Sequence, residues 1–123
     1  MQSICVMRDL YQAIATYENQ FMEIHGLSLN EAMALCCLSE GVLSASEIAE
    51  KSNMKSSHTS KVIKSIEEKK LITRTLGKND KRQMYFKLTE AGKERLNKMS
   101  CESVQIPLIL KPIFKMKCPQ IDD

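Results

Sequence analysis

The spacing of the apolar residues changes after Leu71 of this 123-residue chain, and that change restricts the fold more than any other feature. Up to Leu71 the apolar residues recur every three or four positions, as on one face of a helix. Residues 72–76 and 84–88 instead alternate between apolar and polar, as β-strands do, and residues 77–80 between them have the composition of a turn. The sequence therefore predicts a mainly α fold with a small β-hairpin.

Glycines and capping residues divide the helical part. The first helix has an apolar seam and should end near Gly26, which suits a C-terminal cap. The seam consists of Met7, Leu10, Ile14, Tyr17, Phe21 and Ile24. Ser28 with Glu31, and Ser44 with Glu47, have the spacing of capping boxes and predict the starts of two further helices.

The helix after Ser44 and a helix beginning at Ser56 or Ser57 are separated by a tight turn, which predicts a helix-turn-helix. The inner face of the second helix would hold Thr59, Val62, Ile63 and Ile66, and its outer face Ser56, Ser57, His58, Ser60, Lys61, Lys64 and Ser65. An α-helix fits the major groove of DNA, where small hydroxyls allow close approach and lysines neutralise phosphates. We expect all of these outer residues except Ser65 to bind DNA; a merely solvated basic face is the alternative.

The hairpin and the charge distribution favour the DNA interpretation. Residues 1–50 have a net charge of −6, residues 51–82 of +7 and residues 83–123 of +2. The hairpin contributes Arg74, Lys78, Lys81 and Arg82 as further DNA-binding candidates, as expected of a wing along the phosphate backbone. Asp80 is expected to stabilise the wing by binding loop N–H groups or an arginine. A helix-turn-helix followed by a basic hairpin predicts a winged helix.

Residues 27–96 resemble the winged helix-turn-helix of MarR-type transcriptional regulators. The resemblance lies in the run Ile-Glu-Glu-Lys-Lys-Leu-Ile-Thr-Arg at 66–74, the Asp-Lys-Arg at 80–82 and the Leu-Thr-Glu-Ala-Gly at 88–92. It implies a homodimer on a pseudo-palindromic operator, with the helix after Ser56 in the major groove and Arg82 at the wing tip. It also implies that Asp80 holds the wing, and that a small-molecule effector could act. No residue specifies an effector, and repression or activation stays open.

The resemblance further implies three segments: a dimerisation helix at 1–26, the DNA-binding domain at 27–96 and a C-terminal dimerisation segment at 97–123. The length of the chain predicts that together they form a single compact domain. The expected dimer interface is Met7, Leu10, Ile14, Tyr17, Phe21, Ile109, Leu110 and Phe114. Two departures stand out. Lys70 occupies a position where the family usually has glycine, and Pro107 and Pro112 disfavour one unbroken last helix. Either that helix stops before Pro107 and a second apolar piece packs separately, or dimerisation is atypical.

Other classes of function find less support. The chain lacks the paired carboxylates, phosphate loop or activated nucleophile of an enzyme, and its five cysteines include no Cys-x-x-C pair, so we expect no metal or cofactor. Adjacent Cys36 and Cys37 are expected to be buried thiols. Cys5 leaves a redox-sensing regulator open, and a winged helix that binds proteins without DNA is a second alternative. With neither a transmembrane segment nor a secretory signal evident, we expect a cytoplasmic protein.

Overall fold

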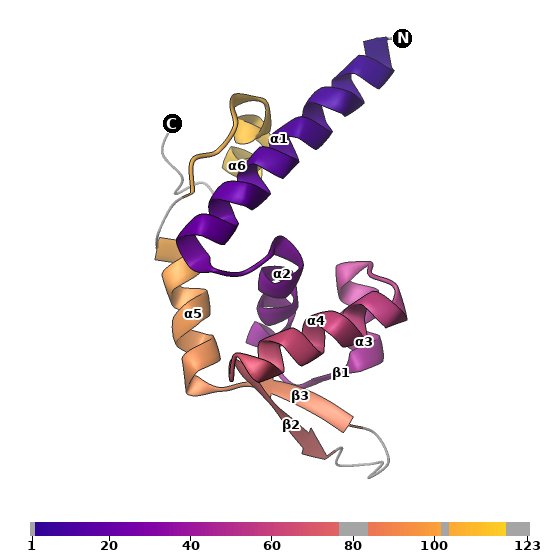
Figure 1. Ribbon diagram of the computed structural model, residues 1–123, viewed down its shortest axis with the longest axis vertical. Coiled ribbons are helices and arrows are strands. Elements are labelled where there is room, and N and C mark those ends of the chain that lie inside the picture. Colours follow the sequence, from indigo (N-terminus) through magenta and orange to yellow (C-terminus); the bar gives the residue numbers. More distant parts are fainter. Residues whose placement is uncertain (1, 77–83, 102–103, 118–123) are drawn as a thin grey trace. The chain divides into compact units, whose positions relative to one another are not determined.

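The computed structural model describes residues 2–76, 84–101 and 104–117. The chain divides into two compact units (Figure 1). The terminal unit combines residues 1–26 with 103–123, and the central unit comprises residues 27–102.

The central unit contains a cluster of helices beside a small sheet (Figure 1). Its helices are α2 (Leu29–Cys37), the short 3-10 helix η1 (Leu38–Glu40), α3 (Ala45–Ser52), α4 (Ser56–Glu68) and α5 (Glu90–Cys101). Both predicted capping boxes are present. The Ser28 hydroxyl accepts the Glu31 N–H at 3.1 Å while the Glu31 carboxylate accepts the Ser28 N–H at 3.0 Å. The box of Ser44 and Glu47 at the start of α3 has the same reciprocal bonds.

The sheet has three antiparallel strands in the order β1-β3-β2. The predicted hairpin is confirmed as β2 (Ile72–Leu76) and β3 (Met84–Leu88), with Ile72 opposite Leu88 and Leu76 opposite Met84. The third strand, β1 (Leu43–Ser44), was not predicted. It pairs with β3 on the edge opposite β2. Because it is only two residues long, it cannot show an alternating pattern.

The core of the central unit is built from the inner faces of these elements. The four residues predicted for the inner face of α4, Thr59, Val62, Ile63 and Ile66, are all buried. They share the interior with Leu27, Ala34, Leu35, Leu38, Leu43, Ile48, Leu71, Ile72 and Phe86. The expectation of a mainly α winged fold is thus confirmed, and burial of one face of α4 leaves the opposite face to solvent.

The terminal unit pairs the long helix α1 (Gln2–His25) with the C-terminal segment. α1 ends at His25, and the next residue, Gly26, has the left-handed φ of 69° expected of a C-terminal cap. The C-terminal segment forms the 3-10 helix η2 (Leu108–Leu110) and the short helix α6 (Lys111–Lys117), and η2 packs on α1. The rings of Tyr17 and Phe114 lie 5.6 Å apart, centroid to centroid.

Of the two arrangements left open for the C-terminus, the structure adopts the first. α5 ends at Cys101, before Pro107, and the apolar piece from Leu108 onward packs separately on α1. Pro107 stands immediately before η2 and Pro112 is the second residue of α6, where the missing N–H removes no helical hydrogen bond.

One expectation about the cysteines is wrong. Cys36 is exposed and Cys37 is only half-buried, with its sulfur 3.4 Å from the Ser52 hydroxyl. On α2 the side chains of Ala34 and Leu35 occupy the buried positions, and the two that follow lie outside the core. In the described part of the chain, Cys5, Cys36 and Cys37 are free thiols, and no helix is long and apolar enough to span a bilayer.

Candidate nucleic-acid interface

The outer face of α4 is polar, basic and open to solvent. The six side chains predicted to bind DNA from this helix, Ser56, Ser57, His58, Ser60, Lys61 and Lys64, are all exposed. The first turn of α4 contains no acidic residue, and the residue before it, Lys55, makes no side-chain cap. The N-terminal N–H groups of α4 are therefore available to an external anion such as a phosphate.

Two of these residues also have partners inside the chain. The Ser60 hydroxyl donates to the Ser56 carbonyl oxygen at 3.1 Å and keeps its acceptor positions open to solvent. The His58 ring approaches α2, where its Nε2 lies 2.9 Å from the amide nitrogen of Asn30. His58 thus links the first turn of α4 to the first turn of α2.

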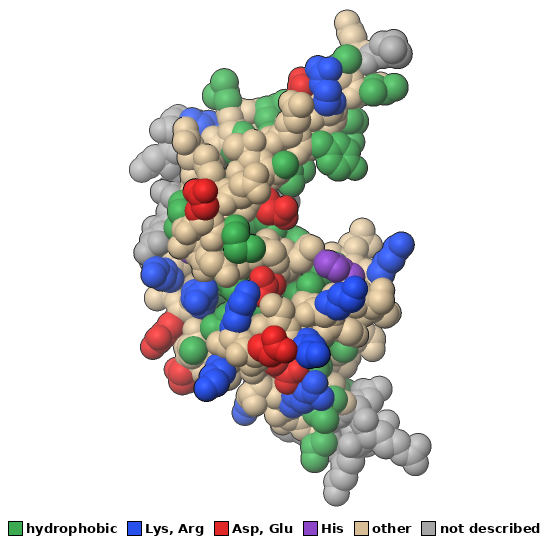
Figure 2. All heavy atoms as spheres, in the orientation of Figure 1, with side chains coloured by type: hydrophobic (Ala, Val, Ile, Leu, Met, Phe, Trp, Pro, Cys, Tyr) green, Lys and Arg blue, Asp and Glu red, His purple; other side chains and the backbone are tan. Residues whose placement is uncertain are grey.

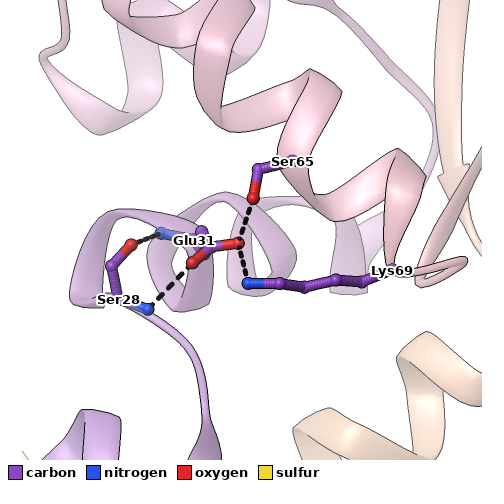
Figure 3. A network of polar contacts seen from close by, with 4 residues as sticks. All are labelled: Ser28, Glu31, Ser65 and Lys69. Atoms are coloured by element: carbon purple, nitrogen blue, oxygen red, sulfur yellow. Dashed lines mark hydrogen bonds and ion pairs between the residues drawn. The ribbon is translucent and has the colours of Figure 1, made fainter.

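Ser65, which the sequence placed on the outer face, is half-buried and faces α2 instead. Its hydroxyl donates to Glu31 Oε2 at 2.8 Å (Figure 3). The ammonium group of Lys69 donates to the same oxygen at 2.7 Å, and the other carboxylate oxygen accepts the Ser28 N–H. The carboxyl of Glu31, whose side chain is only 8% exposed, therefore joins the start of α2 to the last turns of α4.

The ionisation of Glu31 is set by opposing effects. Burial raises the pKa of its carboxyl, but the hydrogen bonds from Lys69, Ser28 and Ser65 together with the charge of Lys69 outweigh burial. The pKa of Glu31 therefore lies below its usual value, and the residue is an anion near neutral pH. The sequence identified Glu31 as a capping residue only. Its contacts with α4 join positions more than thirty residues apart, and the sequence carries no sign of them.

Arg74, a predicted DNA-binding residue, makes a two-pronged contact with Glu67. Its Nε and Nη2 lie 2.7 and 3.0 Å from the two carboxylate oxygens, and its guanidinium carbon lies 5.7 Å from the centre of the Phe86 ring. The hydrogen bonds and charge of Glu67 raise the pKa of Arg74 above its usual range. The pair connects β2 to α4, and the side chain of Arg74 stays 57% exposed.

The segment between α4 and the sheet explains the Leu-Thr-Glu-Ala-Gly motif. Lys70 takes a left-handed conformation with φ of 64°, so this lysine adopts the geometry that glycine favours. Thr89 then holds the turn, since its hydroxyl donates to the Lys70 carbonyl oxygen at 2.8 Å and its N–H donates to that of Leu71. A Cβ atom at Gly92 would overlap the Leu71 carbonyl oxygen, so the start of α5 can approach the turn only without a side chain there.

The basic side chains gather on the central unit. In Figure 2 most lysines and arginines of the visible face lie over the central unit, with acidic side chains among them, and apolar side chains are visible along α1. The described stretch 51–76 alone carries seven bases against two acids. Lys78, Asp80, Lys81 and Arg82, the four residues predicted for the wing loop, lie outside the described residues.

The predicted dimer residues fall into two groups. Phe21 and Leu110 are buried within the single chain, and Leu10, Tyr17 and Phe114 are half-buried. Met7, Ile14 and Ile109 are 51, 46 and 43% exposed. Further large apolar side chains that were not predicted for the interface are exposed in the same unit: Ile4, Val6, Tyr11, Met22, Ile24, Leu108, Ile113 and Met116. Across the described ranges no cluster of three or more potential metal ligands occurs.

Comparison with known proteins identifies the fold. Residues 27–84 match the model of the MarR family. Over these residues, just under half of the chain, the sequence is similar to the MarR family. Its members are transcriptional regulators rather than enzymes, and the segment contains α2, α3, α4 and the first residue of β3. No curated protein matches the chain significantly.

Solved structures extend the likeness of fold over nearly the whole chain. The transcriptional regulator BldR from Sulfolobus solfataricus is 18% identical with a TM-score of 0.73, covering 99% of this chain and 84% of its own. The YusO protein of Bacillus subtilis is 24% identical, with a TM-score of 0.66 and coverages of 99 and 82%. MepR from S. aureus, in a complex with DNA, is 19% identical with a TM-score of 0.71, and the match covers 96% of this chain and 83% of MepR. At these identities the likeness is one of fold.

Proposed function

We propose that this MarR-type protein is a sequence-specific regulator of transcription that binds double-stranded DNA as a homodimer. The outer face of α4 would lie in the major groove, with Lys61 and Lys64 on phosphates and the serines of its first turn near base edges. Lys78, Lys81 and Arg82 would follow the backbone or the minor groove at the wing, held there by Asp80. MepR, a protein of the same fold, has been captured on DNA.

The observation that carries this proposal is the asymmetry of α4. Its inner face is fully buried, and its outer face combines exposed hydroxyls and lysines with an uncapped, acid-free N-terminus. A helix that served only as part of the core would gain stability from an acidic or capping residue in its first turn. The absence of one leaves the N–H groups for a phosphate, at some cost to the free energy of folding.

The dimer is supported by the apolar surface of the terminal unit. Ile4, Met7, Tyr11 and Ile14 follow one another at helical spacing along α1 and are all more than two-fifths exposed. Leu108, Ile109, Ile113 and Met116 add exposed apolar surface from η2 and α6. Apolar side chains in such number mark an association surface, so we assign the outward residues of both segments to a second copy of the chain. Phe21 and Leu110 are buried in the single chain, so they would pack beneath this surface and would not contact the second copy directly.

The alternatives predict different chemistry. A protein-interaction module would have no use for an acid-free basic helix face, and a redox regulator would need a partner for Cys5. Arg8, the base nearest to Cys5 in sequence, has its guanidinium 3.4 Å from the Asp9 carboxylate, which offsets its charge. We therefore retain DNA binding as the function. Control by a small molecule would add to it without replacing it.

Selection of DNA from a random duplex library by the purified full-length chain tests the proposal. We expect enrichment of a site with two related half-sites about one helical turn apart, because a two-fold dimer presents two copies of α4. Enrichment of a single unrepeated half-site would contradict the dimeric mode. Failure to enrich any duplex at low salt would contradict DNA binding altogether.

A further inference from the structure

The Glu31 carboxylate is a buried polar connection between α2 and the helix proposed to read DNA. It belongs to α2, where a capping glutamate needs only its neighbour three residues before. The second capping glutamate, Glu47, is hydrogen-bonded to that neighbour, Ser44, at the start of its own helix. Glu31 accepts two further bonds, from Ser65 and Lys69, with its second oxygen (Figure 3).

These contacts hold the C-terminal end of α4 against α2. Ser65 and Lys69 lie four residues apart, one helical turn, so both donors point from the same side of α4 toward one oxygen atom. The apolar side chains of α4 beside them, Ile63 and Ile66, are buried, but apolar packing is not directional. Hydrogen bonds to a buried carboxylate are directional, so donors on two helices restrict both the rotation of α4 and its position along its axis relative to α2. An apolar contact would not impose this restriction.

We propose that Glu31 is a positioning residue for DNA recognition: it sets the orientation of α4 so that the serines and lysines of the outer face meet the bases in register. This inference rests on the proposed function. Glu31 would not touch DNA itself, because its carboxylate is buried between α2 and α4 and is already held by three donors. Its effect would therefore appear in discrimination between sequences rather than in general attraction to DNA.

The direction of the change in operator affinity distinguishes a positioning role of Glu31 from an effect of its charge. Neutralising Glu31 adds one positive charge per chain, and electrostatics alone would strengthen the binding of every duplex. A positioning role predicts the opposite for the selected operator, since α4 would lose its register. Glu31→Asp keeps the charge but shortens the side chain by one methylene, so it cannot span from Ser28 to Ser65 and Lys69 in the same geometry.

The experiment measures binding of wild type, Glu31→Gln, Glu31→Asp and the matched control Glu47→Gln. The probes are the selected operator and a scrambled duplex of equal length, at a temperature where every variant is folded. We expect both Glu31 variants to lose at least about fivefold in the ratio of operator to scrambled affinity. Glu47→Gln should leave that ratio unchanged even if it lowers the stability of the fold.

Three results would overturn the inference. An unchanged ratio in both Glu31 variants would show that packing alone orients α4. A loss of the ratio in Glu47→Gln equal to that in Glu31→Gln would show that the effect comes from helix capping in general. Absence of operator binding by the wild type would refute the proposed function itself, and the inference with it, whereas operator binding with an unchanged ratio would refute only the inference.

Discussion

The left-handed lysine at the end of α4 yields a sharp prediction about stability. Lys70 has φ of 64°, and a residue with a Cβ atom in that conformation costs about 1–2 kcal/mol. Glycine removes this cost, but its greater conformational freedom stabilises the unfolded chain by about 0.4–1 kcal/mol. Lys70→Gly should therefore raise the free energy of unfolding by about 0.5–1 kcal/mol.

The contacts of Lys70 make the substitution clean. Its side chain is exposed, and the hydrogen bonds it makes to Glu67 and Thr89 use only its backbone N–H and carbonyl, which glycine retains. Urea unfolding followed by circular dichroism measures the effect. With a slope of about 1.5 kcal/mol per molar, the midpoint should rise by about 0.3–0.7 M at unchanged slope.

Two controls isolate the conformational term. Lys70→Ala removes the same side chain but keeps the Cβ atom, so we expect little gain from it. Asn53→Gly changes the other described non-glycine residue with positive φ, and asparagine already tolerates that region, so its gain should be smaller. If Lys70→Ala stabilised the protein as much as Lys70→Gly, or if Lys70→Gly destabilised it, strain at Lys70 would not be the explanation.

Three further outcomes are expected. Glu31→Gln should lower the free energy of unfolding near neutral pH by about 1.5–2 kcal/mol, the lower part of the range for charged hydrogen bonds, because Lys69 is 38% exposed. Because the pKa of Glu31 is lower in the folded protein than its usual 4.5, the stability difference between wild type and Glu31→Gln should be complete above pH 4.5. It should shrink as the pH falls through the lower pKa of the folded state. A stability difference that does not change with pH would contradict an ionised Glu31. Gly92→Ala should cost about 1–3 kcal/mol in thermal or urea unfolding, because its Cβ must push α5 away from the Leu71 carbonyl, and a stabilised variant would refute that contact. Tyr11→Glu should convert a dimer to a monomer in light scattering while Gln12→Glu, its exposed neighbour, should not; equal masses for both variants would remove α1 from the interface.

Local chemistry was readable from the sequence and long-range chemistry was not. Both capping boxes, the buried face of α4 and the hairpin follow from residues within a few positions of one another, and all are present. β1, in which Leu43 pairs with Phe86, was not predicted because two residues cannot show a periodic pattern. The sequence marked Lys70 as unusual where glycine is expected, and the fold places it in the left-handed conformation, with Thr89 bonded to its carbonyl.

The candidate site shows the same division. Periodicity placed six exposed side chains of α4 on its outer face, but it also placed Ser65 there, because one side chain at the edge of a helix face can turn either way. What turns Ser65 inward is the carboxylate of Glu31, from a different helix. Glu67 likewise pairs with Arg74 across the turn between α4 and β2, a contact that residue types alone do not specify.

The proposed function depends on the outer face of α4 binding DNA phosphates, and the salt dependence of binding measures that interaction. Affinity for a duplex should fall linearly with salt on logarithmic axes, and Lys61→Ala or Lys64→Ala should reduce the slope by about 0.9 for each phosphate that the variant no longer neutralises. Lys93→Ala, an equally basic change on the exposed side of α5, should leave the slope unchanged. Equal slopes for the Lys61, Lys64 and Lys93 variants, or binding that does not respond to salt, would contradict a DNA-binding role for this face of α4.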